Sequence, residues 1–440
     1  MIGRTRALLR ACLTFSFGFV FRLAPVVAIA AASLAVAFPA QARSFRTIYS
    51  FPAATGTNIY GPQSGLVVDQ KTGVVYGAAS NGGTGAGGAI FSLTPPVAPA
   101  TRWTLTKLHQ FGNATNDGKS PEGRILGLNG ALYGTTVFGP SLVYRLTPGP
   151  ANKPWNEALL HIYQCCTDVV TPYDGVFYDA KGWAGTRGAF YGVTSRGGAS
   201  NLCFQGCGAV YMLKYASKVW TLTAIHSFTG TTHGWNPTYG VEMDSKGVLY
   251  GQASNGGAHD TGLIYSLAPP VAPKTTWTYT VLHSFSQSNG EGYPISPLLL
   301  YNGALYGSSS IGVVGGPGGT IYKLTPPVAP KKVWTKSNLL TFNGSNGAVP
   351  NGKLLVDKSG AFWGTTFAGG AKNCGTVYKL SPPAGTKKTW TYTLIHSFND
   401  RPDGCGPSNY GLVTDASGAI YGATGSGGAN GSGSIFRIVP

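Results

Sequence analysis

Charged residues are scarce in this sequence. Asp, Glu, Lys and Arg together make up 11% of it, against about 25% in an ordinary globular protein. Disordered chains combine low hydrophobicity with high charge, and a hydrophobic content of 43% excludes that class. Glycine is abundant instead, with 65 residues among 440. A glycine-rich, aromatic-rich and charge-poor composition predicts an all-β protein built from many short strands and tight turns.

Long apolar runs are also missing beyond the first 42 residues, so no membrane span is expected there. The leader itself has four arginines, an apolar run over residues 23–38 and the small-residue sequence Ala40-Gln41-Ala42. This pattern predicts a cleaved signal peptide at residues 1–42, with an uncleaved anchor as the alternative. The mature protein is therefore expected to be secreted, either to the periplasm or to the extracellular space.

Acidic residues are the scarcer charged class, with 15 against 32 basic ones. The formal net charge is +17, and loss of the four leader arginines lowers it to about +13. This excess favours an anionic envelope polymer or an extracellular polysaccharide as partner. Nucleic acid is not expected, because the protein is exported and its charges are thinly spread. The sequence indicates no cofactor, and a monomer is expected.

A repeated unit fills residues 43–440. A Tyr-Gly or Trp-Gly pair recurs at intervals of 56 to 59 residues, at Tyr76, Tyr133, Tyr191, Tyr250, Tyr306, Trp363 and Tyr421. Each unit of about 57 residues contains up to four strand-like runs separated by Asp turns, Gly-rich loops and proline loops. The pattern predicts a seven-bladed β-propeller with four antiparallel strands in each blade.

The two ends of the repeat array predict how the ring closes. The last unit ends at its third strand, near Ile435, and lacks a fourth. Residues 45–51 match the fourth strand of other units, such as Ile225-His-Ser-Phe228. We therefore expect the N-terminal segment to complete the last blade. An open solenoid is the alternative, although neither end has the character of a cap.

The repeat resembles that of the GloVer (Gloeo/Verruco) family of bacterial extracellular proteins. The resemblance rests on Ala131-Leu-Tyr-Gly-Thr-Thr136, Ala361-Phe-Trp-Gly-Thr-Thr366 and Gly375-Thr-Val-Tyr-Lys-Leu380, and it extends over essentially the whole mature chain. It implies export and a propeller-like fold, and it implies no activity.

A ligand is most readily expected on what we call the Gly-rich face, which carries the loops between second and third strands and the links between blades. One residue precedes each innermost strand and differs from blade to blade: Ser64, Glu122, Asp174, Tyr239, Ser296, Asn351 and Tyr410. His233 and Trp235 lie near them in the link to unit four. These residues are expected to surround the mouth of the central channel.

Three interpretations of this mouth remain open. Aromatic and polar side chains together suit the binding of carbohydrate or another polar ligand. The carboxylates Glu122 and Asp174 could cleave a glycoside as a hydrolase or lyase. The third possibility is a solvated surface on a structural or interaction protein.

Cysteines and histidines are few, and we expect them to be structural. Cys374 is expected to pair with Cys405, and the adjacent Cys165 and Cys166 with Cys203 and Cys207, all on the Gly-rich face. No metal site is expected, because zinc-like spacing with nearby histidines is missing. Five histidines recur two residues before the aromatic that ends the fourth strand, which predicts a repeated structural hydrogen bond: His109, His161, His226, His283 and His396.

Overall fold

The structure is a computed structural model. It describes residues 44–150, 153–163, 170–182, 187–200, 202–289, 291–310, 318–330, 333–386 and 388–440. Residues 42–440 form one compact unit. The predicted signal peptide lies outside the described residues. In the described part of the chain, no helix has the length and hydropathy needed to cross a membrane.

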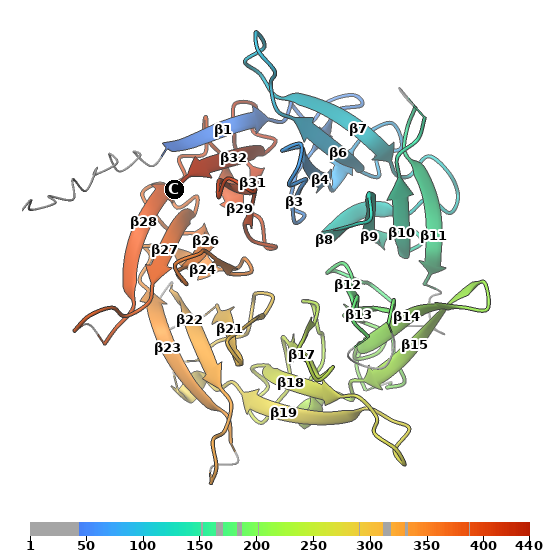
Figure 1. Cartoon of the computed structure of the whole chain (residues 1–440), viewed down its shortest axis with the longest axis vertical. Coiled ribbons are helices and arrows are strands. Elements are labelled where there is room, and N and C mark those ends of the chain that lie inside the picture. Colours follow the sequence, from blue (N-terminus) through green and yellow to red (C-terminus); the bar gives the residue numbers. More distant parts are fainter. Residues whose placement is uncertain are drawn as a thin grey trace, which may run out of the picture. The chain divides into compact units, whose positions relative to one another are not determined.

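Seven antiparallel sheets are arranged around a central axis as the blades of a propeller (Figure 1). The first three, from the innermost strand outward, are β3 (Val67–Val68), β4 (Val75–Ala79), β6 (Ala89–Thr94) and β7 (Thr104–Gln110); β8 (Lys119–Leu128), β9 (Ala131–Phe138), β10 (Leu142–Thr147) and β11 (Asn156–Ile162); and β12 (Phe177–Tyr178), β13 (Phe190–Thr194), β14 (Ala209–Ala216) and β15 (Val219–Ser227). Blades four and five are β16 (Glu242–Met243), β17 (Leu249–Ala253), β18 (Leu263–Ala268) and β19 (Thr278–Ser284), then β20 (Leu299–Tyr301), β21 (Ala304–Ser309), β22 (Gly319–Thr325) and β23 (Thr335–Phe342).

The last two blades have a divided innermost strand. Blade six contains β24 (Ala348–Pro350) and β25 (Leu355–Val356), followed by β26 (Phe362–Ala368), β27 (Thr376–Ser381) and β28 (Thr391–Ser397). Blade seven contains β29 (Cys405–Pro407) and β30 (Val413–Thr414), followed by β31 (Ile420–Ser426), β32 (Ser434–Val439) and β1 (Ser44–Ser50). A short pair, β2 (Ile59–Tyr60) with β5 (Asn81–Gly82), lies in the first unit.

The glycine of the repeated Tyr-Gly pair is required by packing within each blade. A Cβ on Gly134 would lie 2.2 Å from the hydroxyl oxygen of Tyr144, and one on Gly192 would lie 2.2 Å from that of Tyr211. Both tyrosines belong to the third strand and are buried. The large third-strand ring therefore needs a residue without a side chain beneath it, which explains the recurrence of this glycine.

Aromatic contacts join neighbouring blades through the tryptophans that precede the fourth strands. Trp103 packs against Tyr421 of blade seven at 6.3 Å between ring centroids, and Trp155 packs against Tyr76 of blade one at 5.9 Å. Trp277 and Trp334 make the same contact with the preceding blade.

Blades three and six carry a phenylalanine before the motif tyrosine or tryptophan. Phe190 lies between Tyr133 of blade two and Trp220 of its own blade, at 5.0 and 5.7 Å. Phe362 lies between Tyr306 and Trp390 in the same way, at 4.8 Å from each. The phenylalanine ring thus lies between the motif tyrosine of the preceding blade and the fourth-strand tryptophan, which contact each other directly at the other interfaces described above.

The N-terminal strand closes the ring, as predicted from the missing fourth strand of the last repeat. β1 is antiparallel to β32, with Ser44 opposite Val439 and Ser50 opposite Ser434. Phe45 stacks on His396 of blade six at 3.5 Å and packs against Phe436 at 5.4 Å. The chain is therefore a closed seven-bladed propeller, and the open solenoid is excluded.

Candidate functional site

A chain of alternating charges crosses the axis of the propeller. The buried carboxylate of Asp174 accepts hydrogen bonds from the backbone nitrogen and Nε of Arg124, at 3.1 and 3.0 Å, and from the backbone nitrogen of Gly240 at 2.6 Å. Arg124 Nη1 lies 3.5 Å from Glu242 Oε1, which also pairs with the ammonium group of Lys353. Two cations and two anions from four blades thus neutralise one another around the channel.

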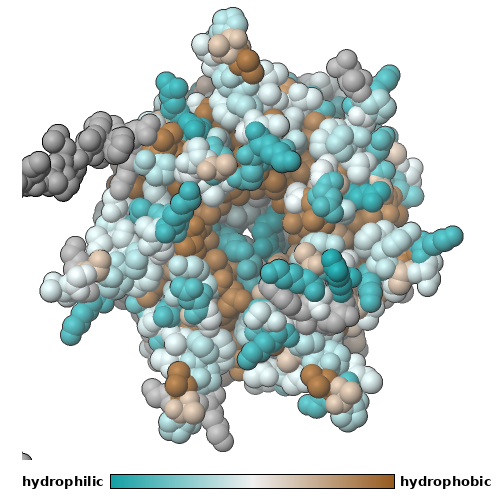
Figure 2. Space-filling view, viewed as in Figure 1, coloured by the Kyte–Doolittle hydropathy of each residue, from teal (hydrophilic) through white to brown (hydrophobic). Residues whose placement is uncertain are grey.

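Three of the predicted mouth residues lie beside this network. Burial, together with the nearby charges of Asp174 and Glu122, raises the pKa of Tyr410 well above its ordinary value. Burial and Asp174 likewise raise the pKa of Tyr239. Burial raises the pKa of Glu122. The structure therefore brings Glu122, Asp174, Tyr239 and Tyr410 together, and a narrow opening is visible at the centre of the ring (Figure 2).

The other mouth residues are engaged with the backbone. Ser64 Oγ accepts from the nitrogen of Ala78 at 2.7 Å, and Ser296 Oγ accepts from the nitrogen of Ser308 at 2.9 Å. Asn351 donates through Nδ2 to the carbonyl oxygen of Pro407 at 3.1 Å. All three are buried. They tie an innermost strand to its surroundings, and their assignment to ligand binding stays a prediction.

A disulfide-closed loop projects from the Gly-rich face between blades three and four. Cys203 is bonded to Cys207, which corrects the expectation that these two cysteines pair with Cys165 and Cys166. The four-residue separation allows a local bond, with 5.0 Å between the Cα atoms. Cys165 and Cys166 lie outside the described residues. The loop exposes Leu202 to 75% and Phe204 to 84%.

A groove of about 770 Å³ runs along one side of this loop. Its lining includes Phe204, Trp235, His259 and Asp260. Trp235 donates through Nε1 to Asp260 Oδ1 at 3.4 Å, and the same oxygen accepts from the backbone nitrogen of Gly256 at 2.9 Å. A carboxylate oxygen and an indole ring are thus held side by side in a concave surface.

His233 lies at the edge of the same region without lining the groove. It ends the short 3-10 helix η1 (Thr231–His233), and its carbonyl oxygen accepts from the hydroxyl of Tyr279 at 2.8 Å. Of the two predicted residues in this link, Trp235 is therefore the one placed in a concave surface.

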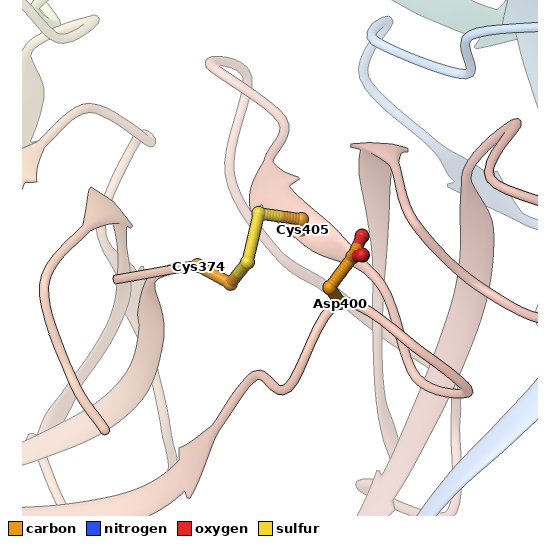
Figure 3. A group of neighbouring side chains, drawn as sticks. All are labelled: Cys374, Asp400 and Cys405. Carbon is orange, nitrogen blue, oxygen red and sulfur yellow. A yellow bond between two sulfur atoms is a disulfide. The ribbon is translucent and has the colours of Figure 1, made fainter. Parts of the chain in front are cut away.

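The second disulfide joins blades six and seven. Cys374, in the loop between β26 and β27, is bonded to Cys405 of β29, which confirms the predicted pair. Figure 3 shows Asp400 beside this disulfide. The three ligand-type atoms lie within 4.8 Å of one another. The sulfurs are bonded to each other and cannot act as thiolate ligands, so this group is a covalent clamp and not a metal site.

The predicted structural hydrogen bond of the repeated histidines is confirmed in three blades. His109 Nε2 lies 3.1 Å from Asp117, His283 Nε2 lies 3.2 Å from Glu291, and His396 Nε2 lies 2.6 Å from Asp403. Each carboxylate also accepts from a backbone nitrogen of the link, as Asp117 does from Asn113 at 2.9 Å. His226 differs, since its ring stacks on Tyr279 at 4.1 Å.

Sequence reasoning missed Arg124, Glu242 and Lys353. Each follows a link by one or two residues and is contributed by, or lies next to, an innermost strand. The available signal was the rarity of charge: in a chain with so few charged residues, three beside innermost strands indicate an axial network. Phe204 and Asp260 also line the groove, and neither was predicted from the sequence as a ligand-binding residue.

The recurring unit of this chain matches a known family of repeats. The model of the Gloeobacter/Verrucomicrobia repeat matches residues 178–389 and 319–440. The chain belongs to this repeat family. Membership in the repeat family, predicted from the recurring motif, is thereby shown over more than half of the chain. No curated protein matches the sequence.

Several solved structures resemble this repeat-family member in fold. An ancestral GH74 enzyme aligns with a TM-score of 0.55 at 11% identity, over 90% of this chain and 51% of that chain. A puromycin-hydrolyzing peptidase of Mycobacterium tuberculosis aligns with a TM-score of 0.50 at 11% identity, over 89% and 55%. A luciferin-regenerating enzyme aligns with a TM-score of 0.42 at 12% identity, over 90% and 95%. Identities this low show the fold alone.

Proposed function

We propose that this propeller is an exported binding module that holds a carbohydrate in the groove between blades three and four. The observation that carries the proposal is the arrangement of Phe204, Trp235, His259 and Asp260 around a concave surface of about 770 Å³. Ligand sites combine concavity with aromatic surface and a few fixed polar groups. This groove has all three.

Export is supported by the two disulfides, because such bonds persist in oxidising compartments. The leader at residues 1–42 has the pattern of a signal peptide. The described part of the groove lining contains the carboxylate of Asp260 and no lysine or arginine, so it suits an uncharged sugar ring. An extracellular polysaccharide is therefore the class of ligand we propose, and the excess of basic residues in the chain as a whole would attract one that also carries acidic groups.

The groove suits a sugar ring in particular. An aromatic face offers apolar contact to the C–H side of a pyranose, while a carboxylate and an imidazole can bond its hydroxyl groups. Asp260 is fixed by Trp235 and by the backbone of Gly256, so it loses little freedom when a ligand binds. Disulfide closure holds Phe204 beside it.

A glycan array screened with the purified protein tests this proposal. We expect binding to glycans that present uncharged sugar rings, and a loss of at least tenfold in affinity for Trp235→Ala and for Phe204→Ala. Phe367→Ala is the matched control, because this exposed aromatic lies in blade six, outside the groove. Binding that survives both groove substitutions would move the site elsewhere, and an array without hits would favour a structural or interaction protein.

Glycoside cleavage by Glu122 and Asp174 has less support. The carboxylate of Asp174 already accepts three hydrogen bonds and pairs with Arg124. A general base needs a free oxygen directed at substrate. Assaying array hits for new reducing ends or unsaturated products tests this alternative, since turnover lost in Glu122→Gln at an unchanged melting temperature would restore it.

A further inference from the structure

Three metal-ligating side chains converge where blades one and two meet. His109 lies on β7, Asp117 in the link that follows it, and Glu157 on β11. His109 Nε2 is 3.1 Å from Asp117 Oδ1 and 3.8 Å from Glu157 Oε2. One ligand atom from each lies within 4.8 Å of the other two. All three side chains are at most 17% exposed.

Their placement is enforced by the blade contact. The backbone nitrogen of Trp155 donates to the carbonyl oxygen of Leu108 at 3.0 Å, which holds the start of β11 against the end of β7. Asp117 Oδ2 is occupied by the backbone nitrogen of Asn113, so Oδ1 faces the histidine. Glu157 Oε1 is buried and has no hydrogen-bond partner among the described residues.

The same position elsewhere in the ring is filled by a cation. Glu157 lies two residues after the tryptophan that precedes its strand, and Lys336 lies two residues after Trp334. Lys336 Nζ is 3.0 Å from Glu291 Oε1, and the other oxygen of Glu291 is 3.2 Å from His283 Nε2. Between blades four and five, the histidine–carboxylate pair is therefore balanced by an ammonium group.

Between blades one and two the equivalent side chain is a second carboxylate. Among the described residues, no ion pair brings a lysine or arginine to Asp117 or Glu157. Two carboxylates at most 17% exposed and held beside one imidazole would be stabilised by an added positive charge, because burial of unpaired negative charge is costly. The equivalent interface between blades four and five indicates the position of such a charge, because Lys336 Nζ lies there beside Glu291.

We propose that His109, Asp117 and Glu157 bind a divalent first-row transition cation such as Zn²⁺, which bridges blades one and two. Zinc binds nitrogen and oxygen at about 2.0–2.2 Å, so ligands in a tetrahedral shell lie ~3.3–3.5 Å apart. The two distances from His109 Nε2 fall on either side of this value. An imidazole with two carboxylates suits zinc better than calcium or magnesium, which prefer oxygen ligands alone.

This proposal departs from the sequence expectation of no metal, which considered cysteine spacing. Two of the ligands are eight residues apart in the sequence and the third lies in the next repeat, so no short motif contains them. The inference does not depend on the proposed carbohydrate site, which lies between blades three and four.

Zinc titration of the purified full chain tests the proposal, with Glu157→Lys as the matched variant. This substitution recreates the arrangement around Lys336 within the same fold. We expect the unmodified chain to bind one more equivalent of Zn²⁺ than the variant, by calorimetry and by metal analysis after dialysis. We also expect added zinc to raise the melting temperature of the unmodified chain and not that of the variant.

Two further chains keep the result unambiguous. His109→Leu removes one ligand, and leucine is already found at the equivalent fourth-strand position of blade five, Leu340. This variant replaces Glu157→Lys in the experiment if Glu157→Lys fails to fold. Lys336→Glu should gain an equivalent of zinc beside His283 and Glu291. Co²⁺ bound at the site should show no thiolate charge-transfer band, which separates it from binding by cysteines. Equal zinc stoichiometry in the unmodified chain, Glu157→Lys and His109→Leu would overturn the proposal.

Discussion

The histidine slot of the fourth strand shows how one residue position is adapted from blade to blade. His109, His283 and His396 each lie beside a carboxylate from the following link. Beyond them the next blade supplies a different neighbour: Glu157, Lys336 or Phe45. The histidine–carboxylate hydrogen bond recurs in three blades, whereas the charge of the neighbouring side chain differs from blade to blade. The hydrogen bond is therefore a structural feature of the repeat, and the chemistry around it is specific to each blade.

Glu291 illustrates the effect of a cationic neighbour. Burial alone would raise its pKa, but hydrogen bonds from His283 and Lys336 outweigh burial and lower the pKa to about 2. A carboxyl group with a depressed folded-state pKa stabilises the fold above its unfolded value, and that stability is lost as the pH falls toward 2. This contribution is fully present at neutral pH.

His226 should make the protein less stable in mild acid. Burial, with a smaller effect of His233, lowers its pKa from 6.5 to about 4, and its Nε2 is buried without a hydrogen-bond partner among the described residues. As the pH falls through this window, the unfolded chain gains a proton that the folded chain does not. The free energy of unfolding therefore decreases until the pH reaches about 4.

We expect His226→Leu to reduce this pH dependence, because leucine occupies the same slot at Leu340. Chemical denaturation at several pH values across the window measures the slope for both chains. His259→Gln is the control, since it removes an exposed histidine and leaves the burial of His226 as it is. Equal slopes in the original chain and in His226→Leu would show that His226 does not titrate with an altered pKa.

Among the elements, the loops of the Gly-rich face carry both described disulfides, and the two bonds differ in reach. Cys374–Cys405 spans 31 residues and joins the loop after β26 to β29 of the next blade. Cys203–Cys207 spans four residues and closes a single loop. The first bond therefore constrains the arrangement of two blades, whereas the second shapes one surface.

Chain entropy predicts unequal contributions to stability from these bonds. Replacing Cys374 and Cys405 together by serine should lower the free energy of unfolding by about 3.5 kcal/mol, against about 2 kcal/mol for Cys203 and Cys207. Urea denaturation of the two double variants measures this difference. A larger loss for the short bond would mean that native contacts of the loop, and not chain entropy, dominate its contribution.

The elements were largely predictable because each repeat carries its own local signals. Tyr133-Gly134 identifies a second strand whose glycine accommodates the ring of Tyr144, and Trp155 marks the start of a fourth strand. The candidate site was less predictable, because its contacts lie between blades. Arg124 and Glu242 are separated by more than two repeats in the sequence and meet only across the axis.

Local geometry also limited the prediction of the cysteine pairs. Position on the Gly-rich face correctly joined Cys374 to Cys405, because neighbouring blades bring those segments together. It could not distinguish a local bond between Cys203 and Cys207 from bonds to another link. The turn that brings those two sulfurs together depends on glycines such as Gly206, whose φ of 86° a side chain would disfavour.

Closure determines whether the whole molecule is a ring. β1 supplies the outermost strand of blade seven, and its Phe45 also contacts His396 of blade six. β1 thus completes the sheet of blade seven and also contributes to the packing of blade seven against blade six. Without it, β32 would present unpaired backbone groups at an edge, and the buried side chains of Ile435 and Phe436 would lose their cover.

Deletion of residues 43–51 should therefore produce an unstable protein that aggregates, although this segment contributes no residue to the groove or to the axial network. Size-exclusion chromatography and thermal melting measure the effect, and a synthetic peptide of residues 43–51 should restore part of the lost stability by pairing with β32. Phe45→Ala provides a graded comparison: it keeps the backbone ladder but removes the ring contacts of this half-buried side chain with His396 and Phe436, so we expect a folded monomer that is less stable by about 2 kcal/mol. A deleted chain that remains monomeric with an unchanged melting temperature would show that the ring does not depend on this closure, because the edge of β32 would then be tolerated without a partner strand.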